Sequence, residues 1–269
     1  MKLEIISRIP DRKKDCPPLF FIHGAYAGAW CWDIHFTDYF SAQGFEVHAV
    51  SLQGHGNSPG KEFLRICGME DYLREVRGIL REMKEAPVLI GHSMGGYVVQ
   101  KCLHDFHSRP AGAVLMASVP PQGMTGPCIR MWWCYPHLCY KLSMINTMPR
   151  WAWEKIVSPE EIRKLIFCDY TRMDTVMKVL PLVQHESVRA QMEMGFSVCL
   201  SSRKNICPVL VLGGREDIII PPEFIRETAK TYDADMHIFP KSGHALMLED
   251  RWENVAETIR AWLEKNYEN

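Results

Sequence analysis

The sequence predicts an α/β protein built on a doubly wound, mostly parallel sheet. Three continuous apolar runs, at residues 19–22, 113–116 and 209–212, are typical of parallel strands that helices cover on both faces. Segments with helical spacing lie between most of the strand candidates, and this alternation favours a parallel sheet. A length of 269 residues is within the range of one such domain.

Apolar patterning predicts seven strands. They cover residues 2–8, 18–22, 45–50, 87–91, 112–117, 207–212 and 235–239. Apolar residues recur at helical spacing in segments 71–81 and 255–263, and a further helical pattern at 94–103 directly follows the fourth strand. Most strands are therefore expected to be joined by a helix.

One long region interrupts the alternation of strands and helices. Residues 120–206 contain no strand candidate and consist of short helical pieces separated by prolines, and the region is rich in Trp, Tyr, Met and Cys. We therefore expect a core domain formed by residues 1–119 and 207–269, with residues 120–206 inserted as a helical lid over the sheet. The two parts are expected to fold as one unit.

Composition limits the classes of partner. The 31 Lys and Arg residues balance 32 Asp and Glu residues, and the absence of a basic run argues against nucleic-acid binding. No segment is long and apolar enough for stable membrane insertion, and the N-terminus has no signal-peptide pattern, so we expect a cytoplasmic protein. The ten scattered cysteines are expected to be free thiols, no metal or cofactor motif appears, and a homodimer remains open.

The most informative motif is Gly91-His92-Ser93-Met94-Gly95, which separates a short apolar run from a helical pattern. A strand, Gly-x-Ser-x-Gly and a helix together form a nucleophile elbow, in which the serine sits on a strained turn with its hydroxyl exposed. Side chains at the two glycine positions would collide across so tight a turn. Ser93 is therefore the predicted nucleophile.

A serine hydroxyl needs a general base, and the base in turn needs a group that orients it. Asp217 follows the strand candidate at 207–212, and His244 follows the strand candidate at 235–239, which gives the chain order Ser, Asp, His. We predict that His244 is the base and Asp217 the acid. Glu216 is the main alternative for the acid.

The tetrahedral intermediate of acyl transfer carries a negative oxygen, which backbone N–H groups must stabilise. One predicted donor is the amide of Met94, at the start of the helix after Ser93. The other is expected in the loop 23–28, whose small residues allow a close approach of backbone to substrate. Ala25 is the candidate there, with Tyr26 as the alternative.

These residues together resemble the α/β-hydrolase superfamily. The matching features are His23-Gly24 after a strand, Gln53-Gly54-His55-Gly56-Asn57-Ser58, the elbow at 91–95, Gly214 with Asp217, and Gly243-His244. The resemblance implies an eight-stranded sheet with two antiparallel strands near the N-terminus and a helical cap after the sixth strand. It also implies that His55 and His92 brace loops rather than catalyse.

Two branches of the superfamily share features with the chain. The Gln53-to-Ser58 motif is similar to that of serine esterases and lipase-like enzymes, whereas Gly28-Ala29-Trp30-Cys31-Trp32 resembles methylesterases and hydroxynitrile lyases. A serine nucleophile favours acyl transfer over the ester-intermediate chemistry of branches with an aspartate nucleophile. The resemblance therefore implies an enzyme of the carboxylic-ester hydrolase type.

The composition of the lid bears on the substrate. Trp and Met side chains suit an apolar acyl or aromatic group, and Tyr26, Trp132 and Trp133 are the predicted pocket residues; these side chains could equally pack the lid on the sheet. The favoured function is hydrolysis of an apolar ester or thioester. The alternatives are a lyase or cofactor-free oxygenase in which His244 acts as the base, and a non-catalytic ligand-binding protein.

Overall fold

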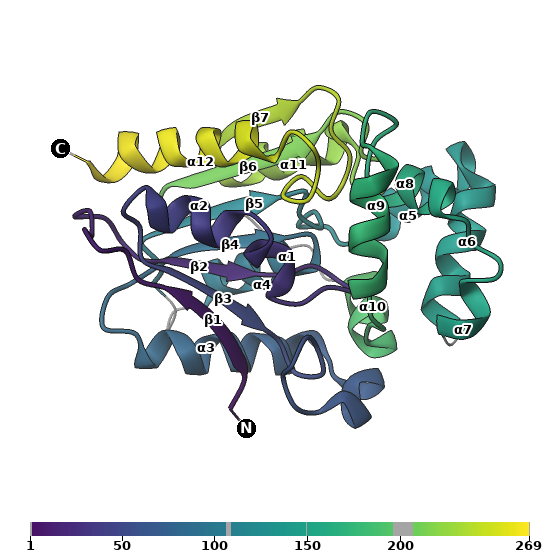
Figure 1. Ribbon diagram of the computed structural model, residues 1–269, viewed down its shortest axis with the longest axis horizontal. Helices are drawn as coiled ribbons and strands as arrows, with labels where there is room; N and C mark the ends of the chain where they lie inside the picture. The colour runs from purple at the N-terminus through teal and green to yellow at the C-terminus, as the bar shows by residue number, and fades with distance from the viewer. Residues whose placement is uncertain (1, 106–108, 149, 196–206, 269) are drawn as a thin grey trace.

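The computed structural model describes residues 2–105, 109–148, 150–195 and 207–268. Seven strands form one sheet with the order β1-β3-β2-β4-β5-β6-β7 (Figure 1). The strands are β1 (Glu4–Arg8), β2 (Leu19–Ile22), β3 (Val47–Ser51), β4 (Val88–His92), β5 (Gly112–Met116), β6 (Val209–Gly214) and β7 (Asp235–Phe239). Only β1 runs antiparallel to its neighbour, which confirms the mostly parallel sheet.

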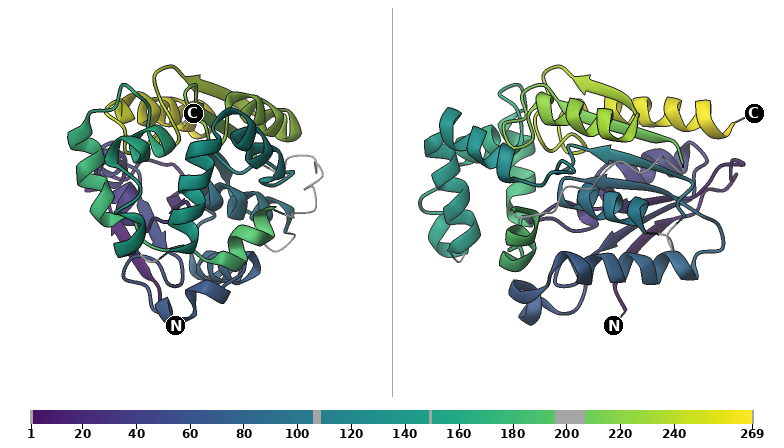
Figure 2. Two further views of the ribbon diagram at one scale, coloured as in Figure 1. Left: turned by 90° about the vertical axis from the view of Figure 1, so that its right-hand side faces the viewer. Right: turned by 180° about the vertical axis from the view of Figure 1, so that it is seen from behind.

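Helices cover both faces of the sheet, because alternate residues of the strands point to opposite sides. The core helices are α1 (Trp30–Asp33), α2 (Phe36–Ala42), α3 (Met69–Glu82), α4 (Met94–His104), α11 (Pro222–Tyr232) and α12 (Trp252–Tyr267), with the short η1 (Lys61–Ile66). Phe21 of β2 joins a buried cluster with α2 and α12, whereas Phe20 joins a second cluster with α3, α4 and α11. Figure 2 shows the two helical layers from other sides.

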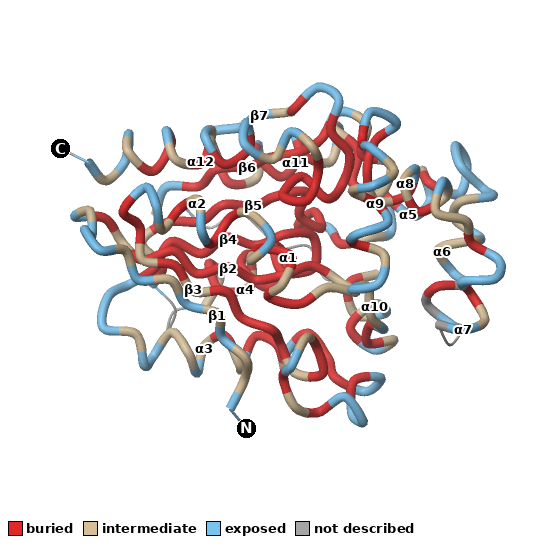
Figure 3. Tube along the Cα trace, viewed as in Figure 1, coloured by how far each residue is buried: buried red, intermediate tan, exposed pale blue. Residues whose placement is uncertain are grey.

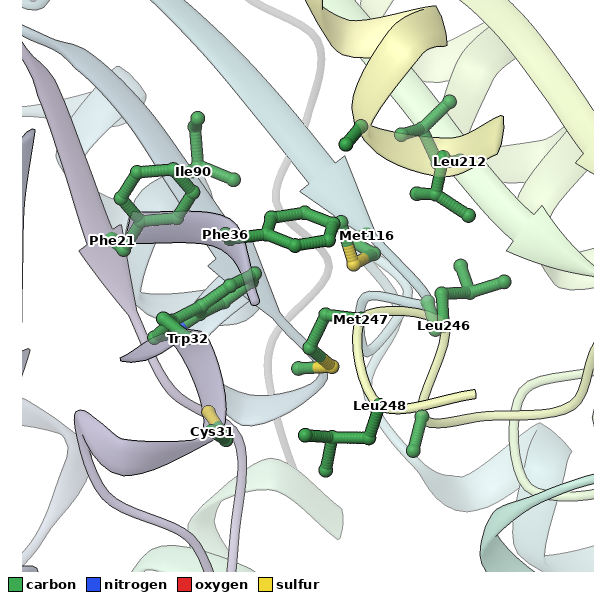
Figure 4. Close-up of a cluster of buried hydrophobic side chains, with 14 of the residues drawn as sticks. Phe21, Cys31, Trp32, Phe36, Ile90, Met116, Leu212, Leu246, Met247 and Leu248 are labelled. Carbon is green, nitrogen blue, oxygen red and sulfur yellow. The ribbon is translucent and has the colours of Figure 1, made fainter. Parts of the chain in front are cut away.

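The central strands are almost completely buried (Figure 3). On one face, the ring of Phe21 lies 4.9 Å from that of Trp32 (Figure 4). Leu246, Met247 and Leu248 belong to the same buried cluster. These three residues follow His244 and Ala245, so the core packing anchors the loop that carries the predicted base.

The expected insertion is helical where the structure describes it. Its elements are α5 (Thr125–Cys134), α6 (Pro136–Thr147), α7 (Arg150–Trp153), α8 (Pro159–Ile166), α9 (Met173–Val179), η2 (Leu180–Leu182) and α10 (Val188–Gly195). They gather at one end of the sheet, between β5 and β6 in the chain (Figure 1). Residues 149 and 196–206 of the expected lid lie outside the described part of the chain.

The expected strand count is corrected from eight to seven. Apolar patterning gave seven strands, and the eighth came only from the family resemblance. The described residues between β1 and β2 include Pro10, Pro17 and Pro18 and contain no strand. Proline cannot donate to a strand ladder, so this segment does not add a second antiparallel strand, and the insertion follows the fifth strand rather than the sixth.

No helix in the described ranges combines the length and the apolar character that a membrane span requires.

Candidate active site

Ser93 sits at the turn between β4 and α4, with a φ of 50° that L-residues rarely adopt. Its amide donates to the carbonyl of Met116 at 3.0 Å, and its carbonyl accepts from Val119 at 3.2 Å, so β5 holds the strained turn in place. A Cβ at Gly91 would strike the backbone of Gly95 across the turn. The local geometry is that of the predicted elbow.

Asp217 and His244 lie side by side although 27 residues separate them. The Asp217 carboxylate accepts a 2.8 Å hydrogen bond from Nδ1 of His244 through Oδ2. Its other oxygen accepts from the amides of Ile219 and Ile220 at 2.8 and 2.9 Å, which fixes the carboxylate. Because Nδ1 carries the ring proton in this bond, Nε2 of His244 is unprotonated and can accept a proton.

The neighbouring carboxylate, Glu216, has a different contact. Its Oε2 accepts from the amide of Ser242 at 3.0 Å and so supports the loop that leads to His244. Glu249 similarly accepts from the amide of Gly243 at 2.7 Å. The structure therefore brings Asp217 to the imidazole of His244 and gives Glu216 a backbone contact instead.

His92 connects the elbow to the base. Its Nε2 donates to the backbone carbonyl of His244 at 2.9 Å, and the two imidazole rings are 4.8 Å apart. Burial, together with the nearby His244, holds the pKa of His92 well below its ordinary value, so the ring is neutral. A side chain at Gly24 would collide with the His92 ring, which shows how closely the loop after β2 lies against the elbow.

The loop after β2 contains both candidates for the second oxyanion donor, Ala25 and Tyr26, and the contacts of their amides differ. The amide of Tyr26 donates to Oε2 of Glu186 at 3.2 Å, so it is already engaged. Within the described part of the chain, the amides of Ala25 and Met94 have no acceptor. The alternative that uses Tyr26 as the donor is therefore corrected in favour of Ala25, because the Tyr26 N–H points to a buried carboxylate.

Glu186 is the centre of a buried polar network. Its two oxygens accept from the amide of Tyr26, from Nε2 of His55 at 3.0 Å, from the hydroxyl of Tyr72 at 3.1 Å, and from the amide of Ser187 at 2.6 Å. This residue lies between η2 and α10, so the network ties the helical insertion to the loop after β2.

His55 is charged within this network. Its Nδ1 faces the carbonyl of Gln53 at 3.0 Å and its Nε2 faces Glu186, so both ring nitrogens must donate. Burial acts to lower the pKa of His55, but the Glu186 carboxylate and the two hydrogen bonds outweigh it, and the pKa lies above its ordinary value. The pKa of Glu186 correspondingly lies below its ordinary value, although burial acts to raise it. His55 and Glu186 thus form a buried ion pair.

A cavity of about 210 Å³ joins the predicted site residues. Ser93, Met94 and His244 line it, together with Ala25 and Tyr26. Further lining side chains are mostly apolar and come from the core and the insertion; they include Trp30, Cys128, Leu142, Val179 and Met194. The structure therefore brings the predicted nucleophile, the predicted base and the residues of both candidate oxyanion amides to one apolar pocket.

Trp132 and Trp133 do not line this cavity. Their side chains are 60% and 79% exposed on α5, whereas Cys128 of the same helix lines the pocket and Met131 is buried. The prediction of these two tryptophans as pocket residues is therefore wrong, and Tyr26 is the one member of that set in the cavity.

A family model for the alpha/beta hydrolase family matches residues 19–258. The chain belongs to the alpha/beta hydrolase family. The match includes the elbow, the Asp217–His244 pair and the loop after β2, so the family covers the whole candidate site.

Similar proteins within the alpha/beta hydrolases carry ester-cleaving names. A pyrethroid hydrolase of Sphingobium wenxiniae is 25% identical over 251 residues, which are 90% of this chain and 85% of that protein. The pFDCC methylesterase MES16 of Arabidopsis thaliana is 32% identical over 111 residues, 40% of this chain and 42% of the plant protein. A solved esterase from Thermogutta terrifontis superposes with a TM-score of 0.72 at 22% identity, covering 98% of this chain and 94% of the esterase, which shows the shared fold.

Some residues of this hydrolase site were not predicted from sequence. Glu186 and Gln191 contact the loop after β2, and neither lies in a recognisable motif. Trp30 lies in the Gly28-to-Trp32 motif, but the sequence did not predict it as a residue of the cavity. Within the described residues, no group of three or more His, Cys, Asp or Glu side chains could hold a metal ion, and none of the nine described cysteines forms a disulfide bond.

Proposed function

We propose that the chain is a serine carboxylic-ester hydrolase that cleaves an ester or thioester with an apolar acyl or aromatic group through an acyl-enzyme. The observation that carries the proposal is the 2.8 Å hydrogen bond from Nδ1 of His244 to Asp217, beside a cavity that His244 shares with Ser93. Relatives with hydrolase and methylesterase names support ester hydrolysis by this fold.

The proton path follows from the tautomer of His244. Ser93 Oγ attacks the substrate carbonyl while Nε2 of His244 takes its proton, and Asp217 stabilises the imidazolium that forms. The proton then passes from Nε2 to the departing alcohol or thiol, which leaves an ester between Ser93 and the acyl group. Water repeats the sequence and releases the carboxylic acid.

Stabilisation of the intermediate is assigned to two backbone amides. Ala25 and Met94 line the cavity, and their N–H groups have no acceptor in the described part of the chain, so they are free to bind the oxyanion. The Met94 amide is at the N-terminus of α4, where the helix dipole favours negative charge. Both groups are set before substrate binds.

The apolar lining favours an apolar acyl or aromatic group. Leu142, Val179 and Met194 from the insertion face the same cavity as the nucleophile. A charged substituent would lose its hydration there without a compensating partner. Esters of small to medium apolar acids therefore fit better than charged ones.

The test is a series of p-nitrophenyl esters of increasing acyl length, with acyl-CoA esters beside them, and labelling by a fluorophosphonate probe. We expect hydrolysis of the apolar esters and labelling of the wild type but not of Ser93→Ala. If Ser93→Ala keeps most of the turnover, a lyase or oxygenase in which His244 alone acts as the base replaces the hydrolase. Absence of both turnover and labelling would leave a ligand-binding protein.

A further inference from the structure

In the described lining of the cavity, Tyr26 and Gln191 form a hydrogen-bonded pair of polar side chains outside the predicted catalytic groups. The hydroxyl of Tyr26 donates to Oε1 of Gln191 at 3.2 Å, and both residues line the cavity. Gln191 lies on α10 of the insertion, so the pair joins the loop after β2 to the helices above the site. Nε2 of Gln191 is buried, and no acceptor for it exists in the described part of the chain.

The pair has more hydrogen-bond donors than the cavity satisfies. The Tyr26 hydroxyl carries one hydrogen and the Gln191 amide carries two, and one hydrogen bond between them uses only one of the three. If the amide were turned so that Nε2 donated to the Tyr26 oxygen, the hydroxyl hydrogen and one amide hydrogen would remain. Two donors therefore stay unpaired in either orientation, and a buried unpaired donor is costly.

The surroundings select the kind of acceptor. Lysine and arginine are absent from the described lining of the cavity, and the Glu186 carboxylate binds the backbone of the same Tyr26. His55 balances the charge of Glu186, and an anionic ligand would lose its hydration in the cavity without a Lys or Arg partner, so a neutral oxygen is favoured. Burial, followed by the charge of Glu186, raises the pKa of Tyr26, so its hydroxyl remains a donor.

We infer that Gln191 and Tyr26 form a subsite for a neutral hydrogen-bond acceptor, such as a ketone or amide carbonyl, within the otherwise apolar part of the substrate. The inference rests on the proposed function and narrows its substrate class. A site that hydrogen-bonds a substrate group discriminates strongly against the analogue that lacks it, because the buried donors are then left unpaired.

The test measures binding without turnover, in the Ser93→Ala protein. The ligands are methyl octanoate and its 3-, 4-, 5-, 6- and 7-oxo derivatives, and the fluorescence of the tryptophans, including Trp30 in the cavity, reports binding. We expect at least one oxo ester to bind about tenfold more tightly than methyl octanoate. The position of that oxo group would then give the distance from the ester to the subsite.

Two further variants in the Ser93→Ala background identify the groups involved. The Tyr26→Phe, Gln191→Met double variant has no hydrogen-bond donor in the subsite, and it is expected to reduce the preference to less than about twofold. Met194→Leu changes an apolar residue of the same helix and cavity, and it should alter both affinities by a similar factor. The inference is overturned if no oxo ester binds more tightly than methyl octanoate, or if the preference survives in the Tyr26→Phe, Gln191→Met double variant.

A spectroscopic readout remains if the double variant does not fold. The stretching frequency of a ¹³C-labelled ketone should fall when the preferred oxo ester binds to Ser93→Ala, because an N–H or O–H donor weakens the C=O bond. A frequency equal to that in an apolar solvent would overturn the inference.

Failure of the inference and failure of the proposed function are distinguishable. Hydrolysis of methyl octanoate by the wild type without any oxo preference in binding overturns the subsite alone. An oxo preference in Ser93→Ala, together with no hydrolysis of any of these esters by the wild type, supports the subsite and contradicts the esterase.

Discussion

Replacing Glu186 with methionine tests whether a buried carboxylate positions the oxyanion loop. Methionine has nearly the same length but offers no strong acceptor. Four donors lose their partner: the amides of Tyr26 and Ser187, the hydroxyl of Tyr72 and Nε2 of His55. The change therefore removes the link between the insertion and the loop after β2 without opening a large cavity.

The magnitude follows from those contacts. His55 can release its proton and become neutral. At a pH above its ordinary pKa of 6.5, His55 therefore contributes little to the loss in the free energy of unfolding. The Tyr26 and Ser187 amides cannot adapt in this way, and each buried unpaired donor costs about 1–3 kcal/mol. We expect the free energy of unfolding to fall by about 4 kcal/mol at pH 8.

The catalytic consequence separates positioning from mere stability. Tyr26 has a φ of 64°, and without its partner we expect the loop to relax and move the adjacent Ala25 amide. Loss of one oxyanion donor costs about 10²–10³ in kcat. Glu186→Met is therefore expected to lower kcat about 100-fold with less than about a threefold change in KM.

The assays are urea unfolding and steady-state hydrolysis of the preferred p-nitrophenyl ester at pH 8. Tyr72→Phe is the matched control, because it removes one donor to the same carboxylate and leaves the Tyr26 contact intact. It should reduce stability by about 1 kcal/mol and leave kcat unchanged. If Glu186→Met loses stability but keeps the wild-type kcat, the carboxylate does not position the oxyanion loop.

Four further substitutions have expected outcomes. Asp217→Asn should lower kcat about 10⁴-fold because the amide favours the wrong tautomer of His244, whereas Glu216→Gln should retain most activity; the reverse result in ester hydrolysis would reassign the acid. Burial raises the pKa of Glu249 to about 7, so its contribution to stability is complete below 4.5 and is lost as the pH rises through about 7. In the wild type, the free energy of unfolding measured by urea titration should fall by about 3 kcal/mol between pH 4.5 and 8, and Glu249→Gln should remove this fall. A variant with the same pH profile as the wild type would contradict the raised pKa of Glu249. Trp133→Ala, at a side chain 79% exposed, should leave kcat/KM for apolar esters within about twofold of the wild type, and a larger loss would return this residue to the substrate site.

The strands and the elbow were predictable because their signals are local. A buried parallel strand is a continuous apolar run, and each of the seven predicted strands overlaps an observed one by all or most of its length. Ser93 was predictable for the same reason, since its turn requires glycine two residues before and after it. The eighth strand failed because it was taken from family analogy, while the prolines at 10, 17 and 18 are incompatible with it.

The pocket was less predictable because it depends on how distant segments return to the sheet. Glu186 and Gln191 reach the loop after β2 from 160 and 165 residues away, and no spacing rule connects them. Aromatic composition suggested Trp132 and Trp133, but composition does not say which face of α5 is covered. Met131 is buried and the two tryptophans after it are exposed, and this difference becomes known only from the position of α5 on the rest of the protein.

Intact-mass and peptide analysis of the enzyme during turnover of a slowly hydrolysed p-nitrophenyl ester tests the central claim most directly. The account predicts a transient mass increase equal to the acyl group on the peptide that contains Ser93, and its absence in Ser93→Ala and His244→Ala. Steady ester cleavage without any acylated species in the wild type, and with undiminished rate in Ser93→Ala, would contradict it.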